Sequence, residues 1–183
     1  TQHTVLMEDL SAYEVLRAQL IGGTVNKDAI AQFTRNLACI QIATHKNTLT
    51  KADFNKLKEA HKNEGMFGLS EQFFFTLPFK RDPANNLVLP PVAEEAEKRV
   101  YDQTAFLDKL AIIKARFLKD QDCIVHGDLH TGSVMVHQAT AKIIYHEFSH
   151  VGPLAYDIAC FVAHLVISYH HHAMATDNPS AQK

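Results

Sequence analysis

Cysteine is scarce in this sequence, with three residues among 183: Cys39, Cys123 and Cys160. An odd number of widely spaced cysteines is not a disulfide framework, which favours a reducing, cytoplasmic setting. A large excess of charge of either sign is lacking too, since the formal net charge is only −2. A chain this close to neutral has no electrostatic reason to bind nucleic acid or an anionic membrane, so we expect neither as a partner.

Long hydrophobic runs, internal repeats and an N-terminal signal sequence are not apparent either. The longest apolar run, residues 158–168, is too short to span a bilayer and contains His164. The sequence instead has an ordinary globular composition, 46% hydrophobic and 21% charged, over a length that suits one domain. We therefore expect a single folded domain over residues 1–172 and a disordered tail over 173–183.

Helical patterns occupy most of the chain. Apolar residues recur at helical spacing after Asn26, between Val92 and Leu118, and between Leu154 and Tyr169. Asn26 or Asp28 is suitably placed to begin the first of these helices. Short β-like runs are found between residues 123 and 144, in the most informative part of the sequence.

That informative part is the stretch from Cys123 to Asp157. Two apolar runs, 124–125 and 134–136, flank a segment that contains two glycines, which indicates a loop between two strands. Gly127 in this loop would let the backbone turn tightly beside a ligand. Asp128 is well placed there to accept a proton from a substrate hydroxyl. The alternative is that Asp128 only caps a turn.

A longer pattern extends this motif. HGDLHTGSVMV at 126–136 is followed in order by Glu147-Phe148, by Gly152-Pro153 and by Tyr156-Asp157-Ile158. Together these segments resemble the aminoglycoside-phosphotransferase-like kinases, a protein-kinase-like family, and within it the methylthioribose kinases. Residues 1–11, with LMEDLS at 6–11, look like the hinge between the two lobes of that family. The resemblance implies an α+β, mostly helical fold: a kinase-like C-terminal lobe with small β-hairpins around the catalytic loop.

The same resemblance implies a reaction and its cofactors. ATP, with Mg²⁺, would donate its γ-phosphoryl group to a sugar hydroxyl, as in methionine salvage, so a small-molecule sugar and a nucleotide are the expected partners. Asp128 would be the catalytic residue and Glu147 a magnesium ligand. Three residues would bind the ATP and Mg²⁺ cofactors: Glu8, Leu10 and Ser133, the last of which occupies the position where many relatives place an Asn metal ligand. His126 and Asp157 would support the catalytic loop.

Two departures from the family pattern bear on activity. Tyr145 stands where the family's magnesium-binding segment begins with an Asp, and a phenol is a poor ligand for this hard ion. The family's N-terminal lobe and its later substrate-binding segments also have no counterpart in these 183 residues. We therefore expect weak or absent kinase activity from this chain alone, with a missing lobe or a second copy of the chain as a candidate partner.

The segment His146-Glu147-Phe148-Ser149-His150 supports a competing interpretation. It matches H-E-x-x-H, in which two His on one turn of a helix bind Zn²⁺ and the Glu activates water. The β-like run before it and Gly152-Pro153 after it argue for a loop here instead. A third ligand is not assigned. The remaining hypothesis is a non-catalytic, kinase-derived binding domain.

Overall fold

The computed structural model describes residues 6–81 and 90–174. The chain forms two compact units, each assembled from segments that are distant in sequence. The first unit comprises Thr1–Ile40, Leu129–His146 and Asp157–Lys183, and the second comprises Gln41–Asp128 and Glu147–Tyr156. The chain thus passes from one unit to the other three times within the central stretch identified in the sequence.

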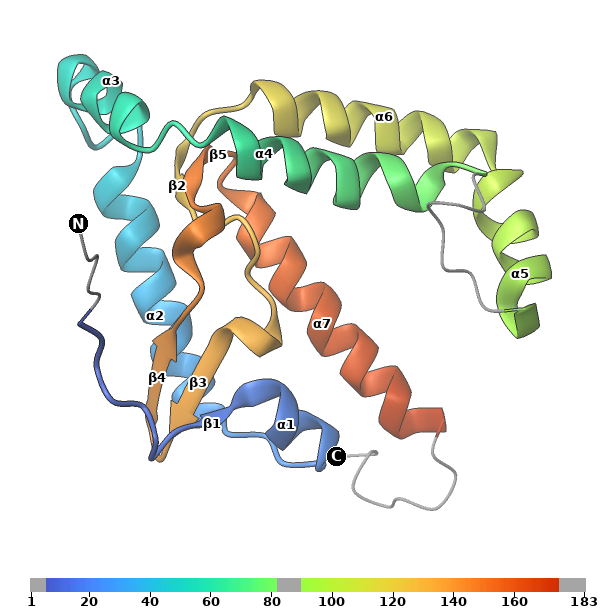
Figure 1. Cartoon of the computed structure of the whole chain (residues 1–183), viewed down its shortest axis with the longest axis horizontal. Coiled ribbons are helices and arrows are strands. Elements are labelled where there is room, and N and C mark those ends of the chain that lie inside the picture. Colours follow the sequence, from blue (N-terminus) through green and yellow to red (C-terminus); the bar gives the residue numbers. More distant parts are fainter. Residues whose placement is uncertain (1–5, 82–89, 175–183) are drawn as a thin grey trace, which may run out of the picture. The chain divides into compact units, whose positions relative to one another are not determined.

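The first unit contains a three-stranded antiparallel sheet (Figure 1). In pairing order its strands are β1 (Glu14–Val15), β3 (Val134–His137) and β4 (Thr140–Ile143). The β3–β4 hairpin aligns Val134 with Ile143, and Gln138 in its turn has a left-handed φ of 52°. Val134 and Val136 are buried and alternate with less buried residues, so one face of the hairpin is apolar, as a strand period of two requires.

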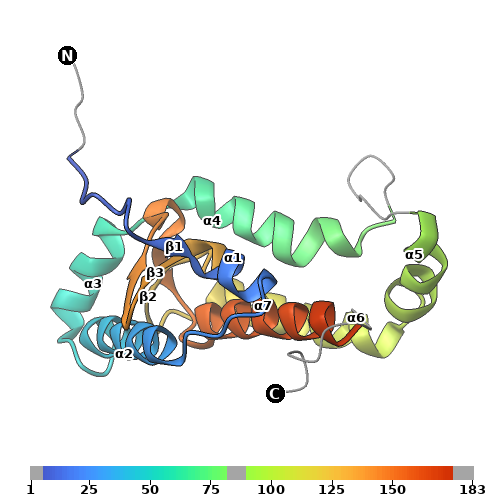
Figure 2. The ribbon, with the colours of Figure 1, turned by 90° about the horizontal axis from the view of Figure 1, so that it is seen from below.

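Helices complete the core of the first unit. They are α1 (Leu16–Ile21), α2 (Lys27–Thr44) and α7 (Ala155–Met174). Figures 1 and 2 both show α2 running alongside β3 and β4. The rings of Phe33 on α2 and Phe161 on α7 have centroids 4.4 Å apart. The buried core residues are Leu16, Leu20, Ala29, Phe33, Leu37, Leu129, Val134, Val136, Ala141 and Phe161.

The start of α2 shows how the sequence sets a helix boundary. The side-chain oxygen of Asn26 accepts a hydrogen bond from the Ala29 backbone N–H at 3.0 Å, which is the contact of a helix N-cap. Its side-chain nitrogen donates to Gln138 O at 2.6 Å and so ties α2 to the hairpin turn. Of the two residues suggested from the sequence as the start of this helix, Asn26 and Asp28, it is Asn26 that caps it.

The second unit contains a two-stranded antiparallel pair, β2 (Cys123–Val125) and β5 (His150–Gly152). Its helices are α3 (Lys51–Ala60), α4 (Glu64–Glu71), α5 (Pro90–Ala96) and α6 (Thr104–Lys119). Short π or 3₁₀ turns occupy Gln72–Thr76, Leu77–Phe79 and Glu97–Tyr101. β2 and β5, which lie toward opposite ends of the central stretch, therefore belong to the same unit.

Aromatic side chains fill the interior of the second unit. Phe67 on α4 and Phe117 on α6 are stacked, with ring centroids 4.9 Å apart, and Figure 1 shows these two helices side by side. Tyr156 also lies 4.9 Å from Phe117, and His150 meets Phe67 edge-on at 5.0 Å. Each such ring pair adds about 0.5–1.5 kcal/mol beyond its buried area, so β5 is fixed against α4 and α6.

The predicted α+β, mostly helical architecture with small sheets is confirmed, but one helix prediction is wrong. The single helix expected between Val92 and Leu118 is divided into α5 with its π turn and α6, because the backbone leaves the helical region at Gln103 (φ −94°, ψ 83°). Tyr101 is buried and donates its hydroxyl to Pro78 O at 3.2 Å. A tertiary contact next to the break thus overrides a helical pattern.

Some predictions fall at the margins of the described chain. Residues 173 and 174 of the predicted disordered tail belong to α7, and residues 175–183 lie outside the described residues. Residues 1–5 of the hinge-like segment also lie outside them. Within 6–81 and 90–174, none of the helices has the length and apolar character needed to cross a bilayer.

Candidate active site

Asp128 and Glu147 emerge from the same end of the β2–β5 pair. The strands pair Cys123 with Gly152 and Val125 with His150 in antiparallel register. Asp128 lies three residues after β2 ends, and Glu147 lies three residues before β5 begins. Beyond the strands, residue 127 still lies against residue 148, because a Cβ added to Gly127 would meet the Phe148 carbonyl oxygen. The two carboxylates that the sequence singles out therefore belong to one short region of the second unit.

Gly127 permits this contact between the two segments. Its φ is +88°, and a Cβ placed on it would lie only 2.3 Å from the carbonyl oxygen of Phe148. The backbones of the two segments are thus in contact at this point, closer than any residue with a side chain would allow. Gly127 is needed both for its left-handed conformation and for this close approach.

His126 contacts the backbone of the same loop. It is 6% exposed, and its Nδ1 accepts a hydrogen bond from the Asp128 backbone N–H at 3.2 Å. Asp128 itself is half-buried, so its carboxylate stands at a boundary between protein and solvent. This geometry agrees with a supporting role for His126, which stays a prediction.

Asp122 fixes the beginning of β2. Its carboxylate accepts hydrogen bonds from Lys46 Nζ at 2.6 Å and from the Leu154 backbone N–H at 3.1 Å, and its own N–H donates to Gly152 O. Burial raises the pKa of Asp122, but the bonds from Lys46 and Leu154 outweigh it and hold the pKa below its ordinary value of 3.8. The carboxylate therefore stabilises the fold above that pH, and the contribution is lost as the pH falls through the lowered pKa.

Ser133, in the first unit, is completely buried at the end of a 3₁₀ turn over Thr131–Ser133. Its hydroxyl lies 3.5 Å from both ring nitrogens of His130, and its carbonyl accepts from the Ile144 N–H at 3.0 Å. Asp157, in the first turn of α7, is also completely buried. A nucleotide contact for Ser133 and a bracing role for Asp157 remain predictions.

The hinge-like segment is exposed and forms no strand over residues 6–10. Glu8 pairs with Lys142 on β4, with Oε2 and Nζ 3.0 Å apart. The Leu10 carbonyl accepts a hydrogen bond from the Tyr13 N–H at 2.8 Å. These contacts hold the segment beside the sheet of the first unit, and contact of Glu8 and Leu10 with a nucleotide stays a prediction.

The zinc interpretation of residues 146–150 is not supported. His146–Phe148 form a 3₁₀ turn and His150 lies in β5, so the helix that would present both imidazoles on one face is not formed. The His150 ring is buried in the aromatic interior, with Nδ1 3.0 Å from Phe148 O. Within the described parts of the chain, no three or more His, Cys, Asp and Glu side chains gather as a metal site.

Tyr145, where the resemblance implies an Asp that binds magnesium, has an unusual conformation. Its φ is +68°, in the left-handed region that bulky residues rarely adopt, and its side chain is 58% exposed. Of the two carboxylates that the resemblance implies, only Glu147 is present, and it is exposed. Magnesium is commonly held by one or two carboxylates together with substrate phosphates, so these residues fit the ion at the lower limit.

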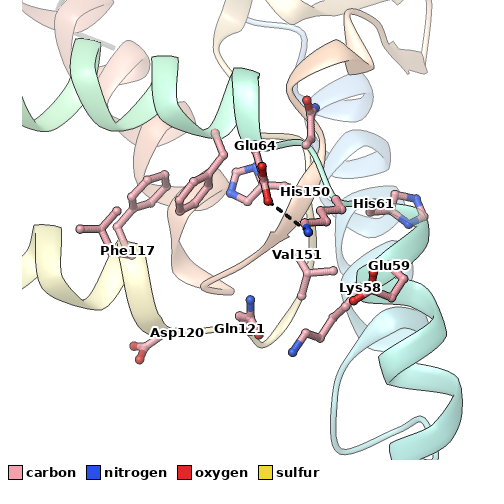
Figure 3. Close-up of a pocket in the computed structure, with 13 residues that line it drawn as sticks. Lys58, Glu59, His61, Glu64, Phe117, Asp120, Gln121, His150 and Val151 are labelled. Carbon is pink, nitrogen blue, oxygen red and sulfur yellow. Dashed lines mark ion pairs between the residues drawn. The ribbon is translucent and has the colours of Figure 1, made fainter.

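A pocket of about 260 Å³ lies in the second unit (Figure 3). Its apolar side includes Phe117, His150 and Val151, and charged residues of α3 and α4 form its rim. Lys62 and Glu64 pair across this rim at 3.1 Å. The rim carries charges of both signs, so the pocket has no evident preference for an anionic or a cationic ligand.

Comparison with known proteins identifies a family for this chain. Residues 27–174 match the phosphotransferase enzyme family, and the chain belongs to that family. Among its relatives are methylthioribose kinases from Enterobacter sp. (strain 638), 29% identical over 165 residues, and from Cronobacter sakazakii, 30% identical over 171 residues. These matches cover 90% and 92% of this chain but 41% and 42% of the relatives.

A methylthioribose kinase from Geobacillus sp. (strain WCH70) is 29% identical over 163 residues, 89% of this chain and 40% of the relative. The chain therefore spans about two fifths of the length of the curated relatives that it matches. The resemblance to methylthioribose kinases predicted from the central stretch is confirmed. It identifies the chain as similar to part of such an enzyme.

Two residues near the site escaped prediction from the sequence. Neither Asp122 nor Asn63 was singled out. Asn63 precedes a helix, which is a recognisable N-cap signal, but nothing in the sequence shows that its side chain contacts the segment containing Glu147. Contacts between residues 84 positions apart have no local signature.

Proposed function

We propose that this chain carries the catalytic part of an ATP-dependent sugar kinase of the methylthioribose kinase type, acting in methionine salvage in the cytoplasm. The observation that carries the proposal is the emergence of Asp128 and Glu147 from one end of the β2–β5 pair. A base for a hydroxyl and a carboxylate for a metal are the two groups that phosphoryl transfer to an alcohol requires from this region. Membership of the phosphotransferase family supports the same assignment.

In this mechanism Asp128 accepts a hydrogen bond from the sugar hydroxyl and takes its proton as the phosphoryl group is transferred. His126 keeps the loop in place through the Asp128 backbone N–H. Glu147, together with the ATP phosphates, would hold Mg²⁺, which when bound neutralises phosphate charge. We assign Ser133, Glu8 and Leu10 to nucleotide contact, and Asp157 to support of the loop within a kinase-like C-terminal lobe.

The direct test measures transfer of radiolabelled γ-phosphate from ATP to methylthioribose. Because the chain matches about two fifths of its relatives, the assay uses the chain alone and also a chimera. In the chimera, the chain replaces the matching segment of the Enterobacter enzyme. We expect transfer by the chimera, and slower transfer by the chain alone. A folded chimera with no transfer above the enzyme-free rate would contradict the proposal and favour a non-catalytic domain.

Tyr145→Asp is expected to tighten metal binding by about tenfold, which is about 1.4 kcal/mol. It supplies a second carboxylate two residues from Glu147, and Asp tolerates the left-handed φ of 68° better than Tyr. Titration with Mn²⁺, which prefers the same oxygen ligands as Mg²⁺, gives the affinity. Tyr169→Asp, at a tyrosine that is 62% exposed on α7, adds the same charge elsewhere. Equal gains from both variants would show that charge alone, and no ligand at position 145, is responsible.

A further inference from the structure

Asn63 occupies the N-cap position of α4 but does not cap it. An Asn at this position normally accepts a hydrogen bond from a backbone N–H in the first turn of its own helix. The Asn63 side chain makes no such bond. Its Nδ2 instead donates to Glu147 O at 2.7 Å and to Ser149 O at 3.2 Å. A side chain suited to stabilise its own helix is therefore used to hold a segment 84 residues away.

The segment that Asn63 holds has little regular structure of its own. It consists of the end of a 3₁₀ turn and the single residue before β5. Three successive carbonyls nevertheless have protein partners, because Asn63 binds those of Glu147 and Ser149, and His150 Nδ1 lies 3.0 Å from that of Phe148. The backbone of Glu147 is thereby fixed even though its carboxylate is exposed.

The same helix also contacts the loop that contains Asp128. Ser70 lies seven residues after Asn63, on the same face of α4, and is 1% exposed. Its Oγ lies 3.5 Å from Gly127 O, so this is a longer contact than those of Asn63. The N-cap and the body of α4 therefore contact both the segment that precedes β5 and the segment that follows β2, and the shorter contacts are those to the segment that contains Glu147.

We propose that Asn63 is a positioning residue that holds Glu147 in the orientation needed to bind the metal. This inference rests on the proposed kinase function. Asn63 does not touch the metal or the substrate, and it acts through the backbone of the Glu147–Ser149 segment. Two hydrogen bonds from one planar amide fix that segment at two points, which limits both its displacement and its rotation.

Asn63→Asp separates positioning from a purely structural role. Asp is as good an N-cap as Asn and suits the positive end of the helix dipole, so a residue that served only α4 would tolerate the change. The carboxylate cannot donate to the two carbonyls and would repel them. Asn63 borders the pocket of Figure 3, which leaves room for the altered side chain. Asn55→Asp, at an exposed position on α3, is the matched control.

The experiment measures amide hydrogen exchange of residues 147–150, Mn²⁺ affinity and global unfolding in urea, all on the full chain. For Asn63→Asp we expect about tenfold faster exchange in this segment and Mn²⁺ binding weakened about three- to tenfold, corresponding to loss of one or two net hydrogen bonds. The urea midpoint should stay within the range of the Asn55→Asp control. Asn63→Ser, which also lacks an amide, is expected to change the exchange and the Mn²⁺ affinity in the same direction.

The possible outcomes are distinct. Unchanged exchange and Mn²⁺ affinity in Asn63→Asp would overturn the inference. Faster exchange with unchanged affinity would also overturn it, because Asn63 would then be a structural contact only. Glu147→Gln provides the check on the proposed function itself. The metal site of the proposed function requires that the unmodified chain bind Mn²⁺ and that Glu147→Gln abolish this binding. If either result is not obtained, the metal site fails, whatever the exchange result shows.

Discussion

Asp128→Asn is expected to lower the rate of phosphoryl transfer by about 10²–10⁴-fold in the chimera, with little change in stability. The amide has nearly the shape of the carboxylate but cannot take a proton from the sugar hydroxyl. The backbone hydrogen bond from residue 128 to His126 Nδ1 does not involve the side chain and should persist. The loss should therefore fall on kcat, while the KM values for ATP and sugar change little.

The control for this substitution is Asp108→Asn, which makes the same chemical change at an exposed position on α6. Both variants are assayed for transfer from ATP over a range of sugar concentrations, and both are checked by urea unfolding. A reduction in kcat of less than about threefold for Asp128→Asn would exclude Asp128 as the proton acceptor. A large loss in both variants would indicate a general effect of removing a carboxylate.

The parts of the site that could be predicted from the sequence are those that depend on neighbouring residues. Two apolar runs around a glycine-containing loop predicted the strands that enter and leave it, and the structure has β2 and β3 there. Asn26 predicted the start of α2 because an N-cap contact spans only three residues. In these segments the apolar residues determine which strands are buried, and the glycines determine where the chain turns, so the residues themselves are enough for the prediction.

The parts that could not be predicted depend on distant partners. The H-E-x-x-H pattern suits a helix by spacing, yet pairing of His150 with Val125 draws that residue into a strand. Asn63 has the sequence signature of a helix cap, yet its amide binds two carbonyls of another segment. For the H-E-x-x-H segment, the flanking β-like run and Gly152-Pro153 already argue against a helix, but they do not identify the strand that pairs with His150. For Asn63, the sequence pattern contains no sign of the tertiary contact that replaces the helix cap.

Gly127→Ala is expected to destabilise the chain by about 3 kcal/mol or more. A left-handed φ of 88° costs an alanine about 1–2 kcal/mol, and the new Cβ would lie 2.3 Å from Phe148 O. The backbone must shift to relieve that overlap, because the nearest atoms belong to the backbone of Phe148. This shift adds about 1–3 kcal/mol to the loss of stability. The shift would separate the Asp128 loop from the segment containing Glu147.

The matched control is Gly68→Ala in the middle of α4, where the added Cβ would have nothing within 4 Å apart from its chain neighbours and the backbone of its own helix. Because alanine has a higher helix propensity than glycine, this change should stabilise the chain by up to about 1 kcal/mol. Urea unfolding of the two variants and the unmodified chain gives both free energies. If the two substitutions change stability by the same amount and sign, the close approach of Gly127 to Phe148 does not constrain the fold. If they differ as expected, the close approach of Gly127 to Phe148 holds the Asp128 loop against the segment that contains Glu147, and the same variant should lose transfer activity in the chimera along with stability.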